Sequence, residues 1–504
     1  MLVSMPIVFF ISVAVSVISS LLLLHSKIPL RFVRMHIVLH SLPPVIVLVA
    51  LNFHHKGGNF GPWRFDHLSW ILALFVLTVG LIVQRYSVHY LLGDRHYRKY
   101  FALLTITTSA DALAWLSDDL RLLLVCWGIT LLGLTLLIGL RKEWQVARQA
   151  AAFTGRMFAL SWIILSIVII WVTQATGHWE LSVVLSEKSL AQLASWEKTL
   201  INLLFILSVM IPAAQWPFQR WLLDSVVAPT PISAVMHAGI VNAGGIMLTR
   251  FAPFFNGDPT QIVLLVIASL SVLIGTGMML VQVDYKRQLV GSTIAQMGFM
   301  LIQCALGAYL AAIIHAILHG LFKSTLFLQA GSAIRHHDPN HENNKSKSYI
   351  WSIMGVVSSV MVGVGYWLQA PFEAYRMISA VALGWSVFLA WTQLVVNGNG
   401  HIARMVGISI FAGAAFVYML IHTVFYKLLE GTIHTGEHPH AFTAISLVLV
   451  LLIISSLGAW LTRNRTSTAF AVIYLWFVRL GEPHRNLVES HPKYLTQILS
   501  RGGK

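Results

Sequence analysis

The segment HAILHGLFKSTLF carries three ionisable side chains, spaced four residues apart, in otherwise apolar surroundings. His315, His319 and Lys323 would share one face of a helix, each about 6 Å further along its axis. Histidine titrates near neutral pH, so two imidazoles and an amine in one row could pass protons. An ionisable side chain at membrane depth costs about 2.5–3.5 kcal/mol on insertion scales, which makes each one a candidate functional residue. A polar seam that joins two helices is the alternative interpretation of the row.

A second group lies in AQWPFQRWLLDSVVAPTPISAVMHAG, where prolines interrupt the apolar pattern. Pro212 and Pro217 end one short apolar segment, and two further prolines open the next helix, with Thr230 as its expected N-cap. His237 follows two turns inside that helix, and Asp224 lies in the connecting segment. Broken helices at membrane depth are tolerated where they line a polar cavity. We therefore add His237 and Asp224 to the candidate pathway, with a tertiary hydrogen bond and a capping role as the respective alternatives.

A third group lies in TTSADALAWLSDD, where acidic residues occur within and after an apolar span. Asp111 follows two threonines by one turn inside the span, and we expect it to belong to an ion pathway. Asp118 and Asp119 end the span and are expected at a water-facing helix junction. The histidine clusters at 336–341 and 434–440 lack a recognised metal-ligand spacing, so both are interpreted as solvated loops.

The composition indicates that a polytopic membrane protein positions these side chains. Of the 504 residues, 57% are hydrophobic and 11% are charged, whereas soluble domains average about 25% charged residues. Apolar stretches of about 20 residues predict an all-α fold with about 15 transmembrane segments. Two cysteines, Cys126 and Cys304, exclude a disulfide framework and a four-cysteine metal site within this chain. The sequence also has no nucleotide-binding or nucleophile-elbow motif.

The net charge of +15 has a topological explanation. If the C-terminus is inside, the inside segments hold 25 Lys and Arg residues and the outside segments hold 8, with Lys323 inside a span. Cytoplasmic loops retain Lys and Arg, so we expect a multi-pass protein of the bacterial inner membrane with its N-terminus outside and its C-terminus cytoplasmic. Membrane lipid then accounts for the basic face, and no nucleic-acid partner is required.

Three long motifs carry a family resemblance. AQWPFQRWLLDSVVAPTPISAVMHAGIVNAGG resembles the signature of the antiporter-like subunits of respiratory complex I and of Mrp-type cation/proton antiporters. DYKRQLVGSTIAQMGFM with HAILHGLFKSTLFLQAGS is similar to a second family stretch, and FDHLSWILALFVLTVGLIVQRYSVHYLLGD resembles the N-terminal part of the L-type subunits. The resemblance runs from about residue 60 to residue 335. It implies inverted five-helix repeats with discontinuous helices, and a midplane proton path that includes His237, His315, His319 and Lys323.

With this resemblance, five regions are expected along the chain. They are N-terminal transmembrane helices (1–100), a first antiporter-like repeat (101–250), a second repeat (251–396), C-terminal transmembrane helices (397–462) and an amphipathic cytoplasmic tail (463–504). The tail contains an apolar stretch, 469–480, that is too short to span a membrane. It would lie on lipid or dock a partner, and the candidate docking residues are Arg463, Arg465, Trp476, Phe477 and Arg479.

Two positions depart from the family pattern. The family places a glutamate after a tryptophan where this chain has Gly128, and a lysine three residues before the Gln of its AQ-x-P motif, where this chain has Pro212. The lysine–glutamate pair of a standard half-channel is therefore absent. A passive anchor that does not conduct is one reading of this loss.

A family member outside complex I fits better, and the chain resembles the membrane subunits of DAB inorganic carbon accumulation complexes. The resemblance implies a large soluble DabA-like partner on the cytoplasmic face, which contains zinc, resembles a β-carbonic anhydrase and hydrates CO2 to bicarbonate. It also implies that this chain is a transporter subunit rather than an enzyme, that it supplies cation flux, and that it holds no cofactor. A proton-pumping subunit of a complex I-like NADH/quinone oxidoreductase and a subunit of a Mrp-type Na+/H+ antiporter are the alternatives.

Overall fold

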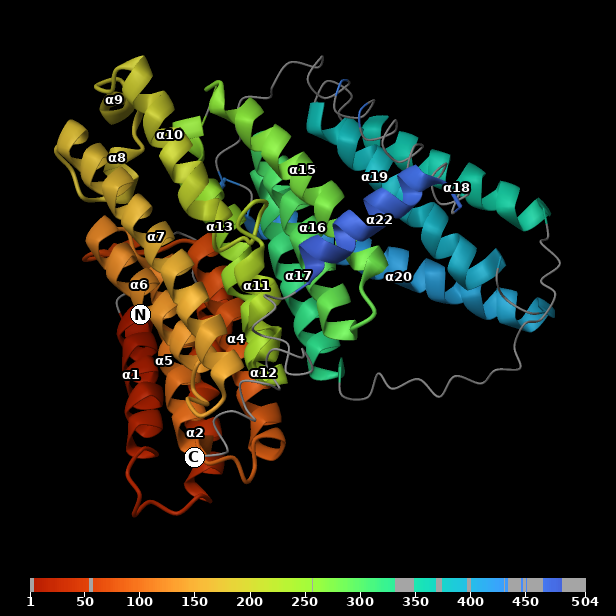
Figure 1. Cartoon of the computed structure of the whole chain (residues 1–504). Helices are drawn as coiled ribbons and strands as arrows, with labels where there is room; N and C mark the ends of the chain where they lie inside the picture. The colour runs from red at the N-terminus through yellow and green to blue at the C-terminus, as the bar shows by residue number, and fades with distance from the viewer. Residues whose placement is uncertain are drawn as a thin grey trace.

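The computed structural model describes residues 4–53, 58–255, 257–330, 349–368, 374–396, 400–429, 431–433, 446, 450 and 466–482 (Figure 1). These residues are mainly helical, with one antiparallel hairpin of β1 (Gly58–Phe60) and β2 (Trp63–Phe65). Within them, ten helical segments are long and apolar enough to cross a membrane. The all-α membrane fold is thus confirmed, whereas the total of about 15 spans stays a prediction.

The N-terminal part of the chain forms an upright bundle, drawn from red to yellow in Figure 1. In this bundle α5 packs between α4 and α6, and α1 packs against α2, α3 and α5. Asp66 and Asp119 start α4 and α6 by accepting backbone hydrogen bonds from Ser69 and Arg121, which is the ordinary N-cap arrangement. The helices are α1 (Ser4–Leu22), α2 (Phe32–His40), α3 (Leu42–Phe53), α4 (His67–Tyr90), α5 (Tyr97–Leu116), α6 (Leu120–Ile138), α7 (Gln145–Thr176), α8 (Leu181–Val184), α9 (Glu187–Leu190) and α10 (Ser195–Met210).

The junction between α5 and α6 differs from the sequence-based expectation. Asp118 and Asp119 lie at a helix junction, but both are buried rather than water-facing. Asp118 accepts a hydrogen bond from the Ser182 hydroxyl at 2.7 Å, which ties the junction to α8. The hydrogen-bonded guanidinium of Arg121 lowers the pKa of the Asp119 carboxyl below its usual value. Asp118 thus has a partner that is distant in sequence, and Asp119 a local one, in place of the expected contact with water.

The centre of the chain contains a broken span. After α11 (Arg220–Asp224) and a 3₁₀ turn (Ser225–Val227), α12 (Thr230–Ala238) ends at Gly239, and a second 3₁₀ turn (Ile240–Asn242) leads into α13 (Ala243–Arg250) and α14 (Ala252–Phe255). Gly239 has φ −103° and ψ −82°, outside the helical region. The interruption expected at the prolines is present, but Gly239 adds a second break inside the helix that they open. Pro229 occupies the N-cap, and Thr230 is the first helical residue. The Thr230 hydroxyl instead pairs with the Tyr90 hydroxyl at 3.1 Å.

The second part of the chain packs beside this broken span. Helix α15 (Thr260–Val281) runs closely along α16 (Tyr285–Ala305), because Gly275 and Gly291 let the two backbones meet. Helix α17 (Tyr309–Leu328) packs on α16, α12 and α13. Helices α18 (Tyr349–Leu368), α19 (Ala374–Trp391) with a π turn (Thr392–Val396), and α20 (Gly400–Leu429) follow, and α22 (Thr468–Gly481) crosses α15.

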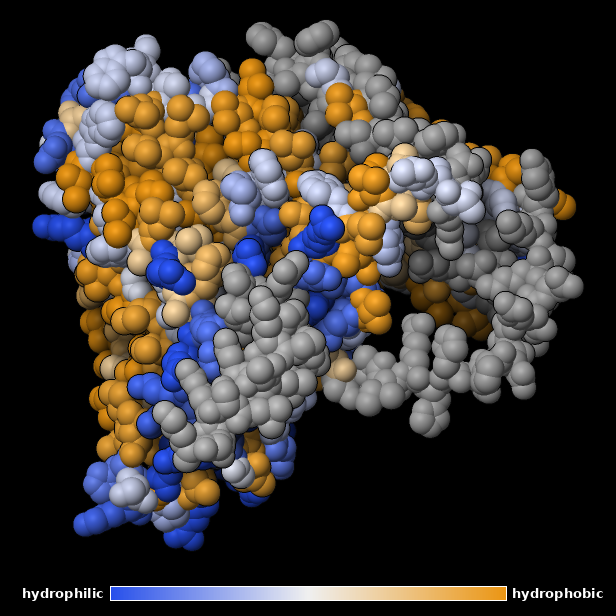
Figure 2. All heavy atoms as spheres, in the orientation of Figure 1, coloured by the Kyte–Doolittle hydropathy of each residue, from blue (hydrophilic) through white to orange (hydrophobic). Residues whose placement is uncertain are grey.

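The surface of the described residues suits a lipid environment. Figure 2 shows hydrophobic side chains along the flank of the bundle and hydrophilic ones gathered at its lower end. Val38, Leu132 and Phe322 are each more than half exposed, which is costly in water and neutral in lipid. The histidine clusters at 336–341 and 434–440, Arg463 and Arg465 lie outside the described residues, as does the part of the expected C-terminal transmembrane region at 451–462.

Candidate functional site

The three side chains of the sequence row line one cavity. Helix α17 directs His315, His319 and Lys323 into a cavity of about 440 Å³. Lys323 is only 1% exposed and His319 only 6%. Polar side chains from α16, α19 and α20 complete the lining, among them Gln296, Gln303, Ser379, Ser386, Tyr418 and His422. The cavity therefore places polar side chains of neighbouring helices near the three ionisable groups of α17, although apolar side chains also line it.

Lys323 is connected to His237 through one turn of α16. The Lys323 Nζ donates a hydrogen bond to the carbonyl oxygen of Leu289 at 3.1 Å, and the Thr293 hydroxyl donates to the same oxygen at 2.9 Å. His237 Nδ1 lies 3.0 Å from the Thr293 oxygen. Because the hydroxyl hydrogen points to Leu289, the Thr293 oxygen accepts a hydrogen from His237 Nδ1. This tautomer leaves His237 Nε2 as the atom that can take up a proton.

The other end of the row is arranged in a similar way. His315 Nδ1 lies 3.2 Å from the Gln303 amide oxygen, so Nδ1 donates and Nε2 is the basic nitrogen. The rings of His315 and His319 have centroids 6.0 Å apart. Neither ring nitrogen of His319 has a hydrogen-bond partner among the described residues, although the ring borders the cavity. Transfer between the two rings therefore needs a bridging hydrogen-bonding group inside the cavity.

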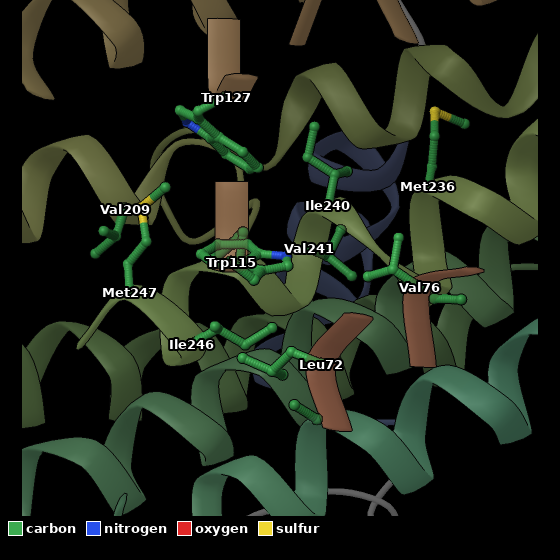
Figure 3. Packing of buried hydrophobic residues seen from close by; sticks show 14 of the residues in the cluster. Leu72, Val76, Trp115, Trp127, Val209, Met236, Ile240, Val241, Ile246 and Met247 are labelled. Atoms are coloured by element: carbon green, nitrogen blue, oxygen red, sulfur yellow. The ribbon is translucent and has the colours of Figure 1, made fainter. Parts of the chain in front are cut away.

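Asp111 lies at the break of the central span. A Cβ placed on Gly239 would lie 3.7 Å from Asp111 Oδ2, so the carboxylate of α5 approaches the point where α12 ends. Around the break, Ile240 and Val241 pack in an apolar cluster with Trp115 and Trp127, as Figure 3 shows. Apolar packing of α5 and α6 around the break thus holds the Asp111 carboxylate beside Gly239. This placement agrees with the pathway role expected for Asp111, which stays a prediction.

Asp224 has a different environment from the row. It ends α11 and lies 3.9 Å from the Arg220 guanidinium, one helical turn earlier. Helix α11 packs against α7 and α16 rather than along α17. The contact with Arg220 fits the capping role that was the alternative interpretation of Asp224. A pathway role for Asp224 stays a prediction.

The two departures from the family pattern have structural correlates. A Cβ on Gly128 would lie 2.9 Å from Trp162 Nε1, which donates to the Leu124 carbonyl at 2.9 Å. The Trp162 indole therefore fills the space that a glutamate at position 128 would need. Pro212 begins the turn after α10, where the chain leaves its helix.

Several residues of the site were not singled out from the sequence. Thr293 and Gln303 orient His237 and His315, and His422 reaches the cavity from α20. Lys286 Nζ donates to the Ala228 carbonyl at 3.4 Å, just before α12. Thr293 and Lys286 both fall in DYKRQLVGSTIAQMGFM, so the signal for them is this motif rather than a row of ionisable residues.

The tail helix α22 places its two aromatic candidates differently. The Phe477 ring covers Gly277 of α15 and is therefore a contact within the chain. Trp476 remains 47% exposed. Arg479 lies in the last turn of α22, where a cation is favourable.

The donor set of the described residues is poor for metals. It contains no group of three or more His, Cys, Asp or Glu side chains that could hold an ion. Cys126 and Cys304 are both buried and unpaired.

These features define a class: a multi-pass membrane subunit of the antiporter-like type, with a broken central span beside a buried row of protonatable nitrogens. The family model described as "NADH:quinone oxidoreductase/Mrp antiporter, TM" matches residues 117–405, and "NADH-Ubiquinone oxidoreductase (complex I), chain 5 N-terminus" matches residues 62–101. The predicted resemblance is confirmed and extends beyond residue 335. The Mrp complex of Dietzia sp. DQ12-45-1b has the same fold, with a TM-score of 0.63, 21% identity, and coverage of 95% of this chain and 59% of that one.

Two relatives narrow the assignment. The "Probable inorganic carbon transporter subunit DabB" of Bacillus subtilis is 56% identical over 98% of this chain and 97% of its own length. The protein of the same description from Bacillus anthracis is 54% identical over 98% of this chain and 97% of its own length. The chain belongs to the DabB subunits of the NADH:quinone oxidoreductase/Mrp antiporter family. It is accordingly a transporter subunit and not itself an enzyme.

Proposed function

We propose that this chain conducts protons as the membrane subunit of an energy-coupled inorganic carbon transporter. Protons moving down their gradient through it drive CO2 hydration to bicarbonate by a soluble, zinc-containing, carbonic-anhydrase-like partner. The observation that carries the proposal is the hydrogen-bonded link from Lys323 through Leu289 and Thr293 to His237, beside a cavity that two more histidines of α17 line. The inorganic carbon function rests on the relatives' names.

The chemistry of the row supports protons rather than Na+. The row offers imidazole and amine nitrogens, whereas hard cations prefer carboxylate and carbonyl oxygens. Lys323 and His237 would both carry positive charge when protonated, and like charges in a low-dielectric interior repel. Lys323 and His237 would therefore be protonated one after the other, which favours proton transfer between them over storage of two protons.

The partner would bind on the cytoplasmic face. In the proposed orientation the N-terminus is outside and the tail is inside, where newly formed bicarbonate would be trapped. The zinc would belong to the soluble partner, in accordance with the poor donor set of the described residues of this chain. Exposed Trp476 on α22 offers an aromatic anchor of the type enriched at interfaces.

Inorganic carbon accumulation in cells tests the proposal. Lys323→Ala removes the amine and leaves a small apolar side chain, so the complex should still assemble. We expect accumulation to fall by about a hundredfold, as for loss of a positioned proton-transfer group. Lys188→Ala, on the separate short helix α9, is the matched control and should keep wild-type uptake. Normal accumulation by an assembled Lys323→Ala complex would show that the row is a structural seam.

A further inference from the structure

A second buried histidine cluster lies in the N-terminal bundle, outside the row. His36 and His40 of α2 are fully buried with Gln84 of α4, between α1 and α5. The Gln84 amide oxygen lies 2.9 Å from His36 Nε2, and its nitrogen lies 3.1 Å from His40 Nε2. Buried polar groups are usually satisfied by one fixed set of hydrogen bonds. In this cluster, by contrast, His36 can be fully hydrogen-bonded in two protonation states.

The bridging amide fixes one proton on each ring. The amide oxygen only accepts, so His36 Nε2 carries a hydrogen, and the amide nitrogen donates to a bare His40 Nε2. Neutral His40 is then protonated on Nδ1, which donates to the Ser16 hydroxyl at 2.7 Å. His40 thereby holds Gln84 in the orientation that directs its oxygen to His36.

The remaining nitrogen of His36 faces a rotatable hydroxyl. Ser19 Oγ lies 2.7 Å from His36 Nδ1 and also 2.7 Å from the Ser16 carbonyl oxygen. In neutral His36, the Ser19 hydroxyl donates to bare Nδ1. When Nδ1 takes up a proton, the hydroxyl turns to the Ser16 carbonyl and accepts from Nδ1 instead. Both protonation states of His36 are therefore hydrogen-bonded without movement of a heavy atom.

The cluster lies between the basic end of the bundle and Asp111. His36 is one turn inside α2, and Arg98 holds the preceding loop by donating to the carbonyls of His25 and Ile28 at 2.7 and 2.6 Å. On the opposite side, His36 Nε2 lies 3.1 Å from the Thr105 hydroxyl of α5. Asp111 follows Thr105 on α5 by six residues, about 9 Å along the helix axis.

Buried polar atoms continue along α5 towards Asp111. The hydroxyl of Ser109 and Oδ1 of Asp111 are buried without a hydrogen-bond partner among the described residues. The Thr108 hydroxyl, between Thr105 and Asp111, donates to the Leu104 carbonyl at 2.8 Å. Ser109 and Asp111 thus offer unpartnered hydrogen-bonding atoms further along α5, near the break at Gly239.

We infer that His36 is a proton relay site on a path between the basic end of the bundle and Asp111 of α5. A proton is taken up at Nδ1 as the Ser19 hydroxyl turns to the Ser16 carbonyl, and the same nitrogen gives it up when the hydroxyl turns back, while Nε2 keeps the proton that the Gln84 oxygen accepts. The inference rests on the proposed proton conduction. It adds a branch of the proton path in the N-terminal bundle. Neither the row on α17 nor the two departures from the family pattern predicted this branch.

Two neighbouring serines allow a matched test. Ser19 and Ser20 are both buried on α1, and each donates to the carbonyl three residues earlier at 2.7 Å, but Ser19 alone of the two contacts a histidine. The wild-type complex, Ser19→Ala, Ser20→Ala, His36→Gln and Lys323→Ala are reconstituted in liposomes. Proton flux driven by a potassium diffusion potential is recorded with a pH-sensitive dye and divided by the amount of folded protein.

We expect Ser19→Ala and His36→Gln to lower the flux by about tenfold or more, the factor for loss of a hydrogen bond to a charged group. Ser20→Ala should conduct like the wild type. Wild-type flux in folded Ser19→Ala and His36→Gln would overturn the inference. If these two variants fail to fold while Ser20→Ala folds, the cluster is structural and the inference is likewise wrong. A wild-type flux no greater than that of Lys323→Ala would instead contradict the proposed function.

Discussion

Lys323 of α17 and Thr293 of α16 donate hydrogen bonds to the same acceptor, the carbonyl oxygen of Leu289. Thr293 also accepts from His237, so its hydroxyl is the one side-chain oxygen that connects the amine to the imidazole across this turn. This arrangement couples the lysine of the row to the broken span.

The first prediction concerns loss of the Thr293 hydroxyl. Thr293→Val keeps the shape of the side chain but leaves His237 Nδ1 without its acceptor, and we expect carbon accumulation to fall by about tenfold. Thr293→Ser keeps the oxygen and should retain most of the uptake. Radiolabelled bicarbonate uptake in cells with equal amounts of each variant measures this. Equal uptake by the Val and Ser variants would show that the link is not used.

The second prediction concerns the energy source. Uptake should stop when an uncoupler collapses the proton gradient, and it should continue when ATP is depleted while the gradient is maintained. The physical reason is that the proposed function draws its energy from proton movement through the row, and the sequence has no nucleotide-binding motif. Simultaneous measurement of uptake, membrane potential and ATP separates the cases. Continued uptake after collapse of the gradient would remove the coupling role.

The third prediction tests the packing that holds the row in place. A Cβ on Gly320 would lie 2.3 Å from Phe75 of α4 and 2.7 Å from the Ala238 carbonyl of α12. Gly320→Ala should therefore destabilise the protein by about 1–3 kcal/mol through overpacking. Gly413 of α20 has nothing within 4 Å of its Cβ position, so Gly413→Ala is the control and should be neutral or slightly stabilising. Thermal unfolding in detergent compares them, and equal stability of the two variants would contradict the described packing.

The fourth prediction concerns the tail. Truncation after Trp460 should release the soluble partner from membranes, because the tail would supply the docking surface. Trp476→Ala should weaken attachment as well, since this ring is exposed on α22, while the chain itself stays folded. Co-purification of the partner with tagged membrane subunit measures both effects. Retention of the partner by the truncated protein would show that the tail only lies on lipid.

The sequence predicted those parts of the site that depend on local spacing. The four-residue steps of His315, His319 and Lys323 place them on one helix face, and they line one cavity. Prolines before His237 predicted a broken helix, and short helical pieces follow them, whereas the further break at Gly239 was not predicted. Both patterns are read within a few turns of one helix, where geometry follows directly from sequence.

Contacts between distant segments could not be predicted in this way. Gln84 joins His36 over 48 residues, and Thr293 meets His237 over 56 residues. The Leu289 acceptor is a backbone carbonyl, which has no side-chain signature. Asp118 was misjudged for the same reason, because its partner Ser182 is 64 residues away. Helix packing decides such pairs, and a single sequence does not record it.

Proton flux through the purified complex in liposomes tests the central claim most directly. A potassium diffusion potential of defined sign is applied, and internal pH is followed for the wild type, Lys323→Ala and Lys188→Ala. The account predicts uncoupler-sensitive flux in the wild type and in Lys188→Ala, and flux reduced about a hundredfold in Lys323→Ala. Equal flux in Lys323→Ala and wild type, with equal protein in the vesicles, would contradict proton conduction through the row.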